Sequence, residues 1–452
     1  MINSQTINST TEEYISTPKT RRSVVITGGS GCLGQHLVKE LIHYNEELEL
    51  GITDIVILDV KEWEPFWRIF TKDEAQHSGL LEQTEEDGMW FPSRDQEDAM
   101  VKFYSVDLCS REAVFQLFEN ELLPQFKIES IFHMMASTKM WAPSLNHFTV
   151  PNVDVTRILL DAALKYSIPN FIYTSSGAVF WKPGHPELTN VSEEDIEIVH
   201  RDENGQVIGV DLKFAKLPES VDYGYVITKQ RAHEMVIAES WKAENGKKLN
   251  TMCLSITTAL YGEADSFGLA KTFVSYGYMV KLGTLVNNVY AGNAAYCHVL
   301  ALKSLFDPVK RDQVRGRTFI VSEETISNHT GYVREVMKHV TGDSETYSDK
   351  NAKEVPIFAF HLMNYMFKAY NYSIHTLSSC YNGAKNWFAF PAATDFLIEW
   401  SFRKGIFTTK SERSRKELGY VPKYHSDQVY KQTARYLLQM EKLGHLKIYR
   451  EK

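Results

Sequence analysis

The chain has 452 residues, of which 43% are apolar and 12% aromatic, and its formal net charge is −8. A chain of this length and composition can bury one large or two smaller cores without disulfides or a structural metal. Its acidic balance argues against a nucleic-acid-binding surface, because binding phosphates needs clustered Lys and Arg. We therefore expect a globular protein with no nucleic-acid partner.

The chain begins with a polar stretch, residues 1–21, that is rich in Ser, Thr and Asn and lacks the apolar run of a signal peptide. This composition predicts a disordered arm before the folded part. The five cysteines, Cys32, Cys109, Cys253, Cys297 and Cys380, are isolated and show no CxxC spacing. They fit a reducing compartment better than a disulfide framework or a zinc site, so we expect a cytoplasmic protein without a metal site.

From residue 22 the sequence alternates between short apolar runs and helical patterns. The runs are SVVITG, DIVILDV, VKFYSVDL, SIFHMMA, NFIYTSS and NTMCLSI. They are rich in β-branched residues and lack clean alternation, which is typical of strands buried on both faces. The stretches between them, such as GQHLVKELIHYN and VTRILLDAALKYS, have helical spacing. This order predicts an α/β fold, a doubly wound parallel sheet of the Rossmann type.

The rhythm of strands and helices also predicts the domains. We expect an NAD-binding Rossmann domain over 22–256, interrupted by polar surface insertions at 61–98 and 181–220. Beyond it the rhythm weakens, and 257–452 is expected to form a smaller, mixed substrate-binding region. In that region 355–377 contains VPIFAFHLMNYMF, which is too short and interrupted to span a membrane. A segment lying at a membrane surface and a core helix are the two alternatives for it.

The first chemical motif, VVITGGSGCLGQHLV, places Gly28, Gly31 and Gly34 between the first predicted strand and a helix. Glycines there permit a tight turn, let the backbone approach a pyrophosphate and allow the helix to pack closely on the strand. The helix N-terminus supplies N–H donors and positive potential. The motif therefore predicts a dinucleotide-binding loop.

Residues that follow the next strands complete the expected cofactor site. The second strand ends at Asp59, whose carboxylate can accept both adenosine-ribose hydroxyls and would repel the extra phosphate of NADP, so NAD is favoured. The alternative for Asp59 is a solvated carboxylate at a strand end. Asp107 and Leu108 follow the third strand, where such folds pack the adenine, and Ala136 and Ser137 end the fourth strand beside the cofactor.

The third motif, Tyr225-Val-Ile-Thr-Lys229, lies on a predicted helix and follows a strand that ends in Ser175 and Ser176. Residues i and i+4 share a helix face, so Tyr225 and Lys229 can reach the same cofactor. A nearby ammonium and oxidised nicotinamide would favour the phenolate of Tyr225 as a base, and Lys229 can also hold the nicotinamide ribose. Ser176 would donate a hydrogen bond to the substrate oxygen.

The same spacing occurs again at Tyr381 and Lys385. We discard that copy because it lies beyond the dinucleotide-binding half and has Gly383 in the middle of a poor helix.

The ordered motifs TGGSGCLG, NVDVTRILLDAALKYSIPNFIYTSS and YVITKQRAHE resemble those of the extended short-chain dehydrogenases. VYAGNAAYCHVLALKSL and YTSSGAVF are similar to the 3β-hydroxysteroid dehydrogenase/isomerase family within that group. The resemblance implies NAD-dependent oxidation of a 3β-hydroxysteroid or sterol, with or without Δ5 to Δ4 isomerisation, and Ser176, Tyr225 and Lys229 as catalytic residues. Members of the resembled branch often associate with endoplasmic reticulum or mitochondrial membranes. The resemblance therefore also implies a peripheral membrane contact, for which we expect the cytoplasmic face of the endoplasmic reticulum.

Two other functions stay open from the sequence. A nucleotide-sugar epimerase or dehydratase shares the fold and the Tyr/Lys pair, although the aromatic-rich second half shows no cluster of Arg and Lys for a diphosphate. A non-catalytic NAD-binding protein would keep the fold without the chemistry, but Tyr225 and Lys229 are both intact. A homodimer is likewise left open.

Overall fold

The structure of the 452-residue chain is a computed structural model. It describes residues 21–71, 90–138, 142–182, 187–242, 249–257, 259–265, 283–323, 325–328, 331–342, 356–380 and 405–448. The expected arm, apart from Arg21, and the second Tyr-x-x-x-Lys copy at Tyr381 and Lys385 lie outside the described residues.

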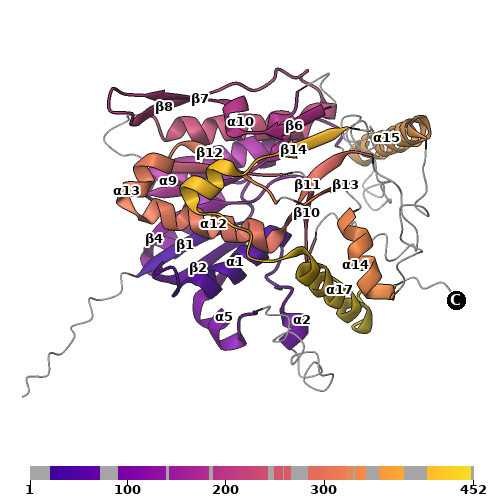
Figure 1. The fold of residues 1–452 in the computed structure, drawn as a ribbon, viewed down its shortest axis with the longest axis horizontal. Helices are drawn as coiled ribbons and strands as arrows, with labels where there is room; N and C mark the ends of the chain where they lie inside the picture. Colours follow the sequence, from indigo (N-terminus) through magenta and orange to yellow (C-terminus); the bar gives the residue numbers. More distant parts are fainter. Residues whose placement is uncertain are drawn as a thin grey trace, which may run out of the picture.

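A seven-stranded parallel sheet forms the centre of the molecule (Figure 1). Its strands lie in the order β3-β2-β1-β4-β5-β9-β12, and every neighbouring pair is parallel. Their bounds are β1 Arg22–Thr27, β2 Ile52–Asp59, β3 Val101–Ser105, β4 Ile128–His133, β5 Asn170–Ser176, β9 Asn250–Ile256 and β12 Arg317–Val321. The first six correspond to the six apolar runs, so the predicted doubly wound sheet is confirmed.

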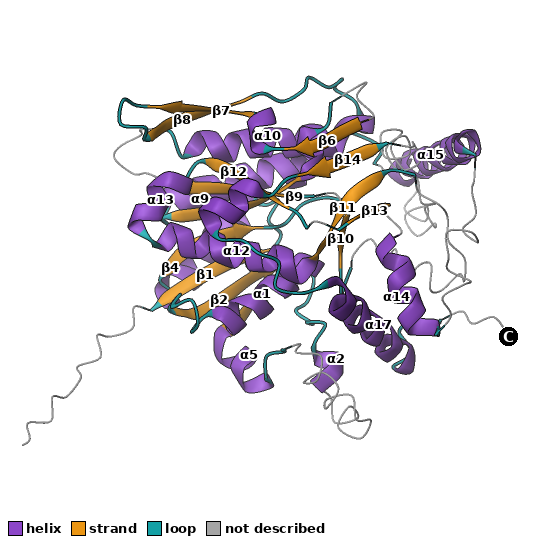
Figure 2. Cartoon of the chain, viewed as in Figure 1, coloured by secondary structure: helices purple, strands orange, loops and turns teal. Residues whose placement is uncertain are grey.

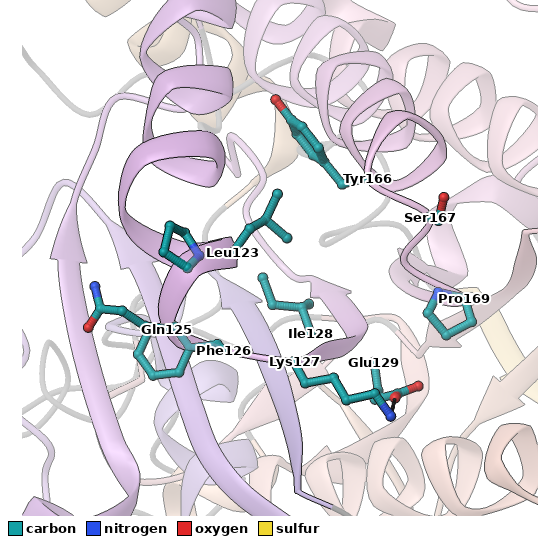
Figure 3. A pocket seen from close by; sticks show the side chains of 10 residues that line it. Leu123, Gln125, Phe126, Lys127, Ile128, Glu129, Tyr166, Ser167 and Pro169 are labelled. Carbon is teal, nitrogen blue, oxygen red and sulfur yellow. Dashed lines mark ion pairs between the residues drawn. The ribbon is translucent and has the colours of Figure 1, made fainter.

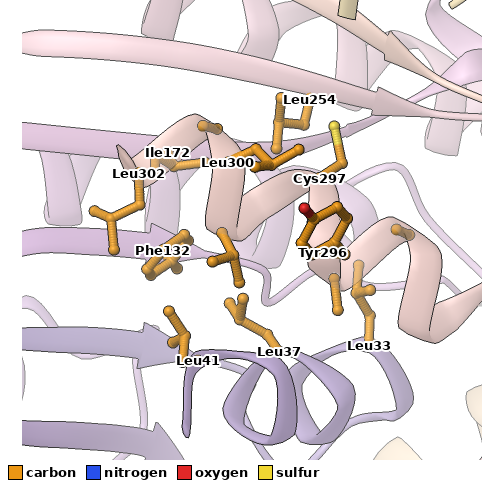
Figure 4. Packing of buried hydrophobic residues seen from close by; sticks show 14 of the residues in the cluster. Leu33, Leu37, Leu41, Phe132, Ile172, Leu254, Tyr296, Cys297, Leu300 and Leu302 are labelled. Carbon is orange, nitrogen blue, oxygen red and sulfur yellow. The ribbon is translucent and has the colours of Figure 1, made fainter. Parts of the chain in front are cut away.

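Helices cover both faces of this sheet (Figure 2). One face carries α1 (Cys32–Tyr44) and α12 (Ala291–Phe306), whose Leu37 and Leu300 share a core with Phe132 of β4 (Figure 4). The other face carries α6 (Arg111–Leu117), α9 (Val155–Lys165) and α10 (Gly224–Glu239), which bury a second apolar core against the same strands. Because the strands are covered on both sides, their side chains are apolar without alternation.

A smaller five-stranded sheet accounts for the mixed second region. Its strands are β10 Ala259–Tyr261, β11 Leu285–Tyr290, β14 Ile406–Thr409 and β6 Glu187–Val191, with β13 Ile326–Asn328 antiparallel to β11. Beside it, α14 (Gly331–Thr341) and α17 (Ser426–Lys442) pack around a tyrosine-rich core that includes Tyr261 and Tyr290. The remaining elements are α2 Arg68–Thr71, α5 Arg94–Met100, η1 Phe118–Leu122, α7 Leu123–Gln125, α8 Asn146–Thr149, η2 Val150–Asp154, η3 Gly177–Phe180, η4 Glu193–Asp195, β7 Glu197–Arg201, β8 Val207–Leu212, η5 Val221–Tyr223, α13 Pro308–Val314, α15 Ile357–Cys380 and η7 Ser414–Leu418.

The expected domain boundary at residue 256 does not separate the two sheets. Strand β12, beyond that position, completes the large sheet, and β6, from the stretch 181–220, joins the small one. The stretch 181–220 packs against the large sheet because β12 is an edge strand, and the N–H groups on its open side need hydrogen-bond partners. Thr318 donates its N–H to Glu197, Ile320 donates to Glu193 Oε1 at 2.8 Å, and Arg413 donates to Thr318 O at 3.0 Å. The stretch 181–220 is therefore partly internal rather than a surface insertion.

The stretch 61–98 is also more than a surface insertion where it is described. Phe66, Trp67 and Phe70 are buried in the core that α1 shares with the sheet. Buried Glu97 accepts hydrogen bonds from the indole N–H of Trp67 at 3.2 Å and from Arg68, and so ties both ends of the stretch together. Aromatic side chains bury large areas, so this segment contributes to the fold.

Candidate active site

The carboxyl ends of β1 to β5 meet at one edge of the parallel sheet, where ligands bind in such folds. The glycine-rich loop leaves β1 at this edge. Gly28 has a φ of +72°, and a Cβ atom there would lie 2.9 Å from the backbone of Met135, so only glycine fits. A Cβ at Gly34 would lie 2.6 Å from Gly28 O, whereas Gly31 meets only Gly28 O, at 3.2 Å. No side chain caps α1, so its N-terminal N–H groups can bind an anion.

Asp59, at the end of β2, is held in place by the main chain. Its Oδ2 accepts the N–H of Ser30 at 3.1 Å, and its Oδ1 accepts the N–H of Lys61 at 3.0 Å. Each carboxylate oxygen has a second lone pair, so the group can still accept the two ribose hydroxyls. The loop and this carboxylate therefore fit the pyrophosphate and adenosine ribose of NAD.

The residues that we expected near the adenine, Asp107 and Leu108, follow the neighbouring strand β3. Val60 is 69% exposed directly after Asp59, and an exposed valine at this edge offers an apolar surface to a base. Leu108 is buried, whereas Asp107 is exposed and uses its Oδ1 to accept the N–H of Cys109 at 2.9 Å. Asp107 thus fixes the turn after β3, and Leu108 belongs to the core beneath it.

The loop after β4 is fixed by Asn152, which the sequence analysis did not single out. Its Oδ1 accepts the N–H of Ser137 at 2.6 Å, and its Nδ2 donates to Thr228 on α10 at 3.0 Å. Ala136 and Ser137 are therefore tied to the helix that carries Tyr225. The hydroxyl of Ser137 is buried without a hydrogen-bond partner, which leaves it available to a cofactor.

Ser176 and Tyr225 come together although 49 residues separate them in the chain. Ser176 ends β5, where its Oγ accepts the N–H of Ala178 at 3.2 Å, and Tyr225 lies in the first turn of α10. Burial raises the pKa of the Tyr225 phenol above its ordinary value, and a hydrogen bond with Ser176 lowers it. The two hydroxyls can therefore contact one substrate oxygen.

Lys229 lies one turn after Tyr225 and is buried. Its Nζ donates to Thr174 O of β5 at 2.7 Å and lies 4.2 Å from the ring centroid of Tyr173. Burial lowers the pKa of this ammonium to about 7. The amine bonds to the strand rather than to the phenol, so its effect on Tyr225 stays a prediction for the NAD-bound protein.

Two buried histidines near Lys229 form hydrogen bonds that join strands and helices of the site. Burial lowers the pKa of both to about 3, with the nearby Lys229 charge as a second cause, so both are neutral near pH 7. His133 bonds to Thr27 and Thr156, and His233 bonds to Ser175 and Thr318, all at 2.7 to 3.0 Å. These bonds connect strands to helices. Both ring nitrogens of each histidine are bonded to Ser or Thr hydroxyls rather than to Lys229.

Helix α15 contacts η5, the short segment that precedes the helix carrying Tyr225, and α8. Lys368 forms an ion pair with Asp222 at 3.1 Å, three residues before Tyr225, and the rings of His147 and His375 lie 5.9 Å apart. Phe358, Leu362 and Met366 of α15 are 71%, 61% and 62% exposed and recur every four residues. None of the helices described is long and apolar enough to cross a membrane.

The surface cavity in Figure 3 lies at the opposite end of the sheet, where β4 and β5 begin. It has a volume of about 550 Å³ and is lined by side chains such as Leu123, Phe126, Ile128 and Tyr166, with a Lys127–Glu129 ion pair at 2.7 Å. No predicted site residue lines it. In the part of the chain that the structure describes, no group of three or more His, Cys, Asp or Glu could hold a metal ion.

Comparison with known proteins agrees with this geometry. The model of the 3-beta hydroxysteroid dehydrogenase/isomerase family matches residues 94–348, more than half of the chain. The sterol-4-alpha-carboxylate 3-dehydrogenase ERG26, decarboxylating, of Candida albicans is 27% identical over 342 residues, which cover 74% of this chain and 78% of the relative. The protein of the same name from Saccharomyces cerevisiae is 25% identical over 328 residues, which cover 70% and 75%.

Solved structures with the same fold are more distant in sequence. DesIV, a dTDP-glucose 4,6-dehydratase from Streptomyces venezuelae solved with NAD bound, has a TM-score of 0.58 and 13% identity over 93% of this chain and 98% of its own. At that identity the likeness concerns the fold alone. The family match covers β3 to β12 and includes the positions of Ser176, Tyr225 and Lys229, while the glycine-rich loop and Asp59 lie before it. The chain therefore belongs to the 3-beta hydroxysteroid dehydrogenase/isomerase family and is an NAD-dependent oxidoreductase that acts on a CH–OH group.

Proposed function

We propose that this chain oxidises the 3β-hydroxyl of a sterol that carries a 4α-carboxylate, with NAD as the oxidant, and that the product loses CO2. The relatives named as decarboxylating sterol-4-alpha-carboxylate 3-dehydrogenases support the substrate class. The observation that carries the chemistry is the pair of hydroxyls from Ser176 and Tyr225, placed one turn from a buried Lys229.

In the oxidation, Tyr225 as the phenolate takes the proton of the C3 hydroxyl, and Ser176 donates a hydrogen bond to the same oxygen. NAD supplies the hydride acceptor. Lys229, one turn further along α10, would favour the phenolate when it is protonated in the NAD-bound protein, because an opposite charge stabilises it. The ketone that forms keeps its oxygen between the two hydroxyl groups.

The second step follows from the chemistry of a β-keto carboxylate. The bond between C4 and the carboxylate breaks, CO2 leaves, and the electron pair moves into the C3 carbonyl as an enolate. Tyr225 and Ser176 then act as donors to the enolate oxygen, as an oxyanion hole would. A proton finally returns to C4. Because the electron pair comes from the C–CO2 bond, Δ5 to Δ4 isomerisation is not needed and is left out of the proposal.

Helix α15 suggests how such a substrate arrives. Sterols are scarce in water, and the exposed row of Phe358, Leu362 and Met366 lies on a helix joined to the Tyr225 segment by the Lys368–Asp222 ion pair. Apolar and aromatic side chains of this kind bind at the boundary of a bilayer. We propose that α15 rests on a membrane surface, at the cytoplasmic face of the endoplasmic reticulum, and that the sterol enters beside it.

A substrate panel tests the proposed function. The full-length protein with NAD would be given a 4α-carboxy-3β-hydroxysterol, the same sterol without the carboxylate, and UDP-glucose. NADH and CO2 would be measured together for the sterols, and conversion of UDP-glucose would be followed by chromatography, because epimerisation and dehydration regenerate NAD. We expect one CO2 for each NADH from the first compound and NADH without CO2 from the second. Turnover of UDP-glucose, or no NADH from either sterol, would overturn the proposal in favour of a nucleotide-sugar enzyme or a non-catalytic protein.

A further inference from the structure

The side-chain amide of Gln35 joins the glycine-rich loop to the segment that follows β2. Gln35 lies on α1, one residue after Gly34, and is only 2% exposed. Its Nε2 donates to Ser30 O at 2.9 Å, and its Oε1 accepts the N–H of Phe66 at 2.7 Å. Both ends of the amide are therefore used to bridge two stretches of main chain that are 36 residues apart.

Ser30 and Asp59 make a second connection between the same two stretches. Ser30 gives its N–H to Asp59 Oδ2 and its Oγ–H to Lys61 O at 2.9 Å, while Lys61 gives its N–H to Asp59 Oδ1. Together with the Gln35 bridge, these bonds form a closed ring that runs from the loop through Asp59 to Phe66 and back. The carboxylate that would meet the ribose therefore sits inside a network fixed on both sides.

Phe66 gives this ring a stiff support. The side chain is buried, and its ring lies 4.6 Å from the ring of His36 on α1 and 5.3 Å from that of Trp67. The indole groups of Trp63 and Trp67 both donate to Glu97, at 2.9 and 3.2 Å. The segment bonded to Gln35 is thus anchored in the core. Through Gln35 it can keep the glycine-rich loop at a fixed position relative to Asp59.

We propose that Gln35 is a positioning residue that holds Asp59 against the adenosine ribose and so sets the preference for NAD over NADP. Gln35 is buried beneath the loop and acts through Ser30 and Asp59. Discrimination by a carboxylate depends on its staying where the 2′-phosphate would lie. Without the bridge, the loop and the segment after β2 can separate, and Asp59 can turn towards water.

Binding measurements on the full-length protein test this role and need no sterol. Gln35→Met keeps the length of the side chain but loses both hydrogen bonds. The dissociation constants of NAD and NADP would be measured by titration calorimetry. We expect NAD to bind about tenfold more weakly, as for the loss of a well-placed pair of buried bonds, with a smaller change for NADP. The ratio of the two constants should therefore fall several-fold.

Asn45→Leu is the matched control. Asn45 also bridges two main-chain groups with its amide, accepting from Ile52 N at 2.9 Å and donating to Ile52 O at 2.8 Å, but at the far end of β2. It should lower the melting temperature without changing the NAD to NADP ratio. Gln35→Glu, which keeps the acceptor for Phe66 N–H and loses the donor to Ser30 O, should lower the ratio even if Gln35→Met fails to fold. An unchanged ratio in the folded Gln35 variants, or an equal fall in Asn45→Leu, would overturn the assignment.

Discussion

The cofactor side and the substrate side of this molecule are built differently. At the adenosine end, Ser30 and Asp59 are locked by main-chain hydrogen bonds, and the segment after β2 is buried against α1. Beyond Tyr225, α15 instead shows large apolar side chains to the outside. The contrast indicates that the residues expected at the adenosine end are held by hydrogen bonds within the chain, whereas the side chains of α15 offer an apolar surface to the outside. This fits a soluble cofactor and a substrate that comes from a membrane.

The largest effect should follow from Tyr225→Phe, which deletes the proton-transfer oxygen at the junction of the two sides. General acid and base groups contribute roughly 10² to 10⁴ in rate, so kcat should fall by that amount. The dissociation constant of NAD should stay nearly unchanged, because the hydrogen bonds that hold Asp59 at the adenosine end do not involve this hydroxyl. Steady-state kinetics and calorimetry check both numbers.

Tyr381→Phe serves as the control for this variant, because Tyr381 has the same spacing to a lysine. It should change kcat only slightly. Near-normal turnover in Tyr225→Phe would mean that another group transfers the proton.

Lys229→Met should weaken both catalysis and NAD binding, because Lys229 belongs to both sides of the site. It also gives a pH signature. Burial lowers the pKa of Lys229 from 10.5 to about 7, so between these values the unfolded chain binds a proton that the folded chain does not. Stability of the wild type should therefore rise with pH over that interval, by about 2 kcal/mol from about pH 7 to about pH 9. Chemical unfolding of the wild type and of Lys229→Met at the two pH values measures how the free energy of unfolding changes with pH. An equal change in both proteins would show that Lys229 is not buried as described.

Asp59→Ser should remove most of the discrimination between cofactors. We expect the wild type to prefer NAD at least tenfold in kcat/KM, because charge repulsion and lost hydroxyl bonds together are worth more than about 1.4 kcal/mol. In the variant the preference should approach one. Asp107→Asn, at the neighbouring strand end, is the control and should change kcat/KM for NAD and for NADP by the same factor. Equal efficiency of the wild type with NAD and NADP would contradict the role that we propose for Asp59.

The smallest effect is expected on the substrate side. Replacing Phe358, Leu362 and Met366 by Ser should release the protein from liposomes in a flotation assay and raise the KM for sterols in vesicles several-fold, while NAD affinity stays the same. The control replaces Ile208 of β8, Val309 of α13 and Val421 of the loop after η7, which are 59%, 75% and 64% exposed. A triple α15 variant that still floats with the vesicles would place the membrane contact elsewhere.

Much of the fold could be predicted because its signals are local. Six strands follow from buried apolar runs, and Gly28, Asp59, Ser176 and Tyr225 follow from motifs at strand ends. Strand β12 was missed although RTFIV is fully buried, because nothing local distinguishes a last central-sheet strand from one in a second sheet. Its edge depends on Glu193 and Glu197, more than 120 residues earlier.

The supporting residues of the site could not be predicted for the same reason. Asn152 and Gln35 are polar residues on helices that read as ordinary surface positions, yet each bridges segments distant in sequence. Val60 could have been singled out from the sequence, because it directly follows the strand-end carboxylate of Asp59. For 355–377, the exposed row on α15 favours the surface alternative over the core helix, and the membrane itself stays a prediction.

We propose that hydride passes from C3 of a sterol to NAD at the Tyr225–Ser176 pair. This transfer can be followed with a 4α-carboxy-3β-hydroxysterol that carries deuterium at C3, with the reduced cofactor analysed by mass spectrometry. We expect NADH that contains one deuterium, in an amount equal to the CO2 released, and almost none with Tyr225→Phe. Reduced cofactor without deuterium, or CO2 released with no reduction of NAD, would contradict it.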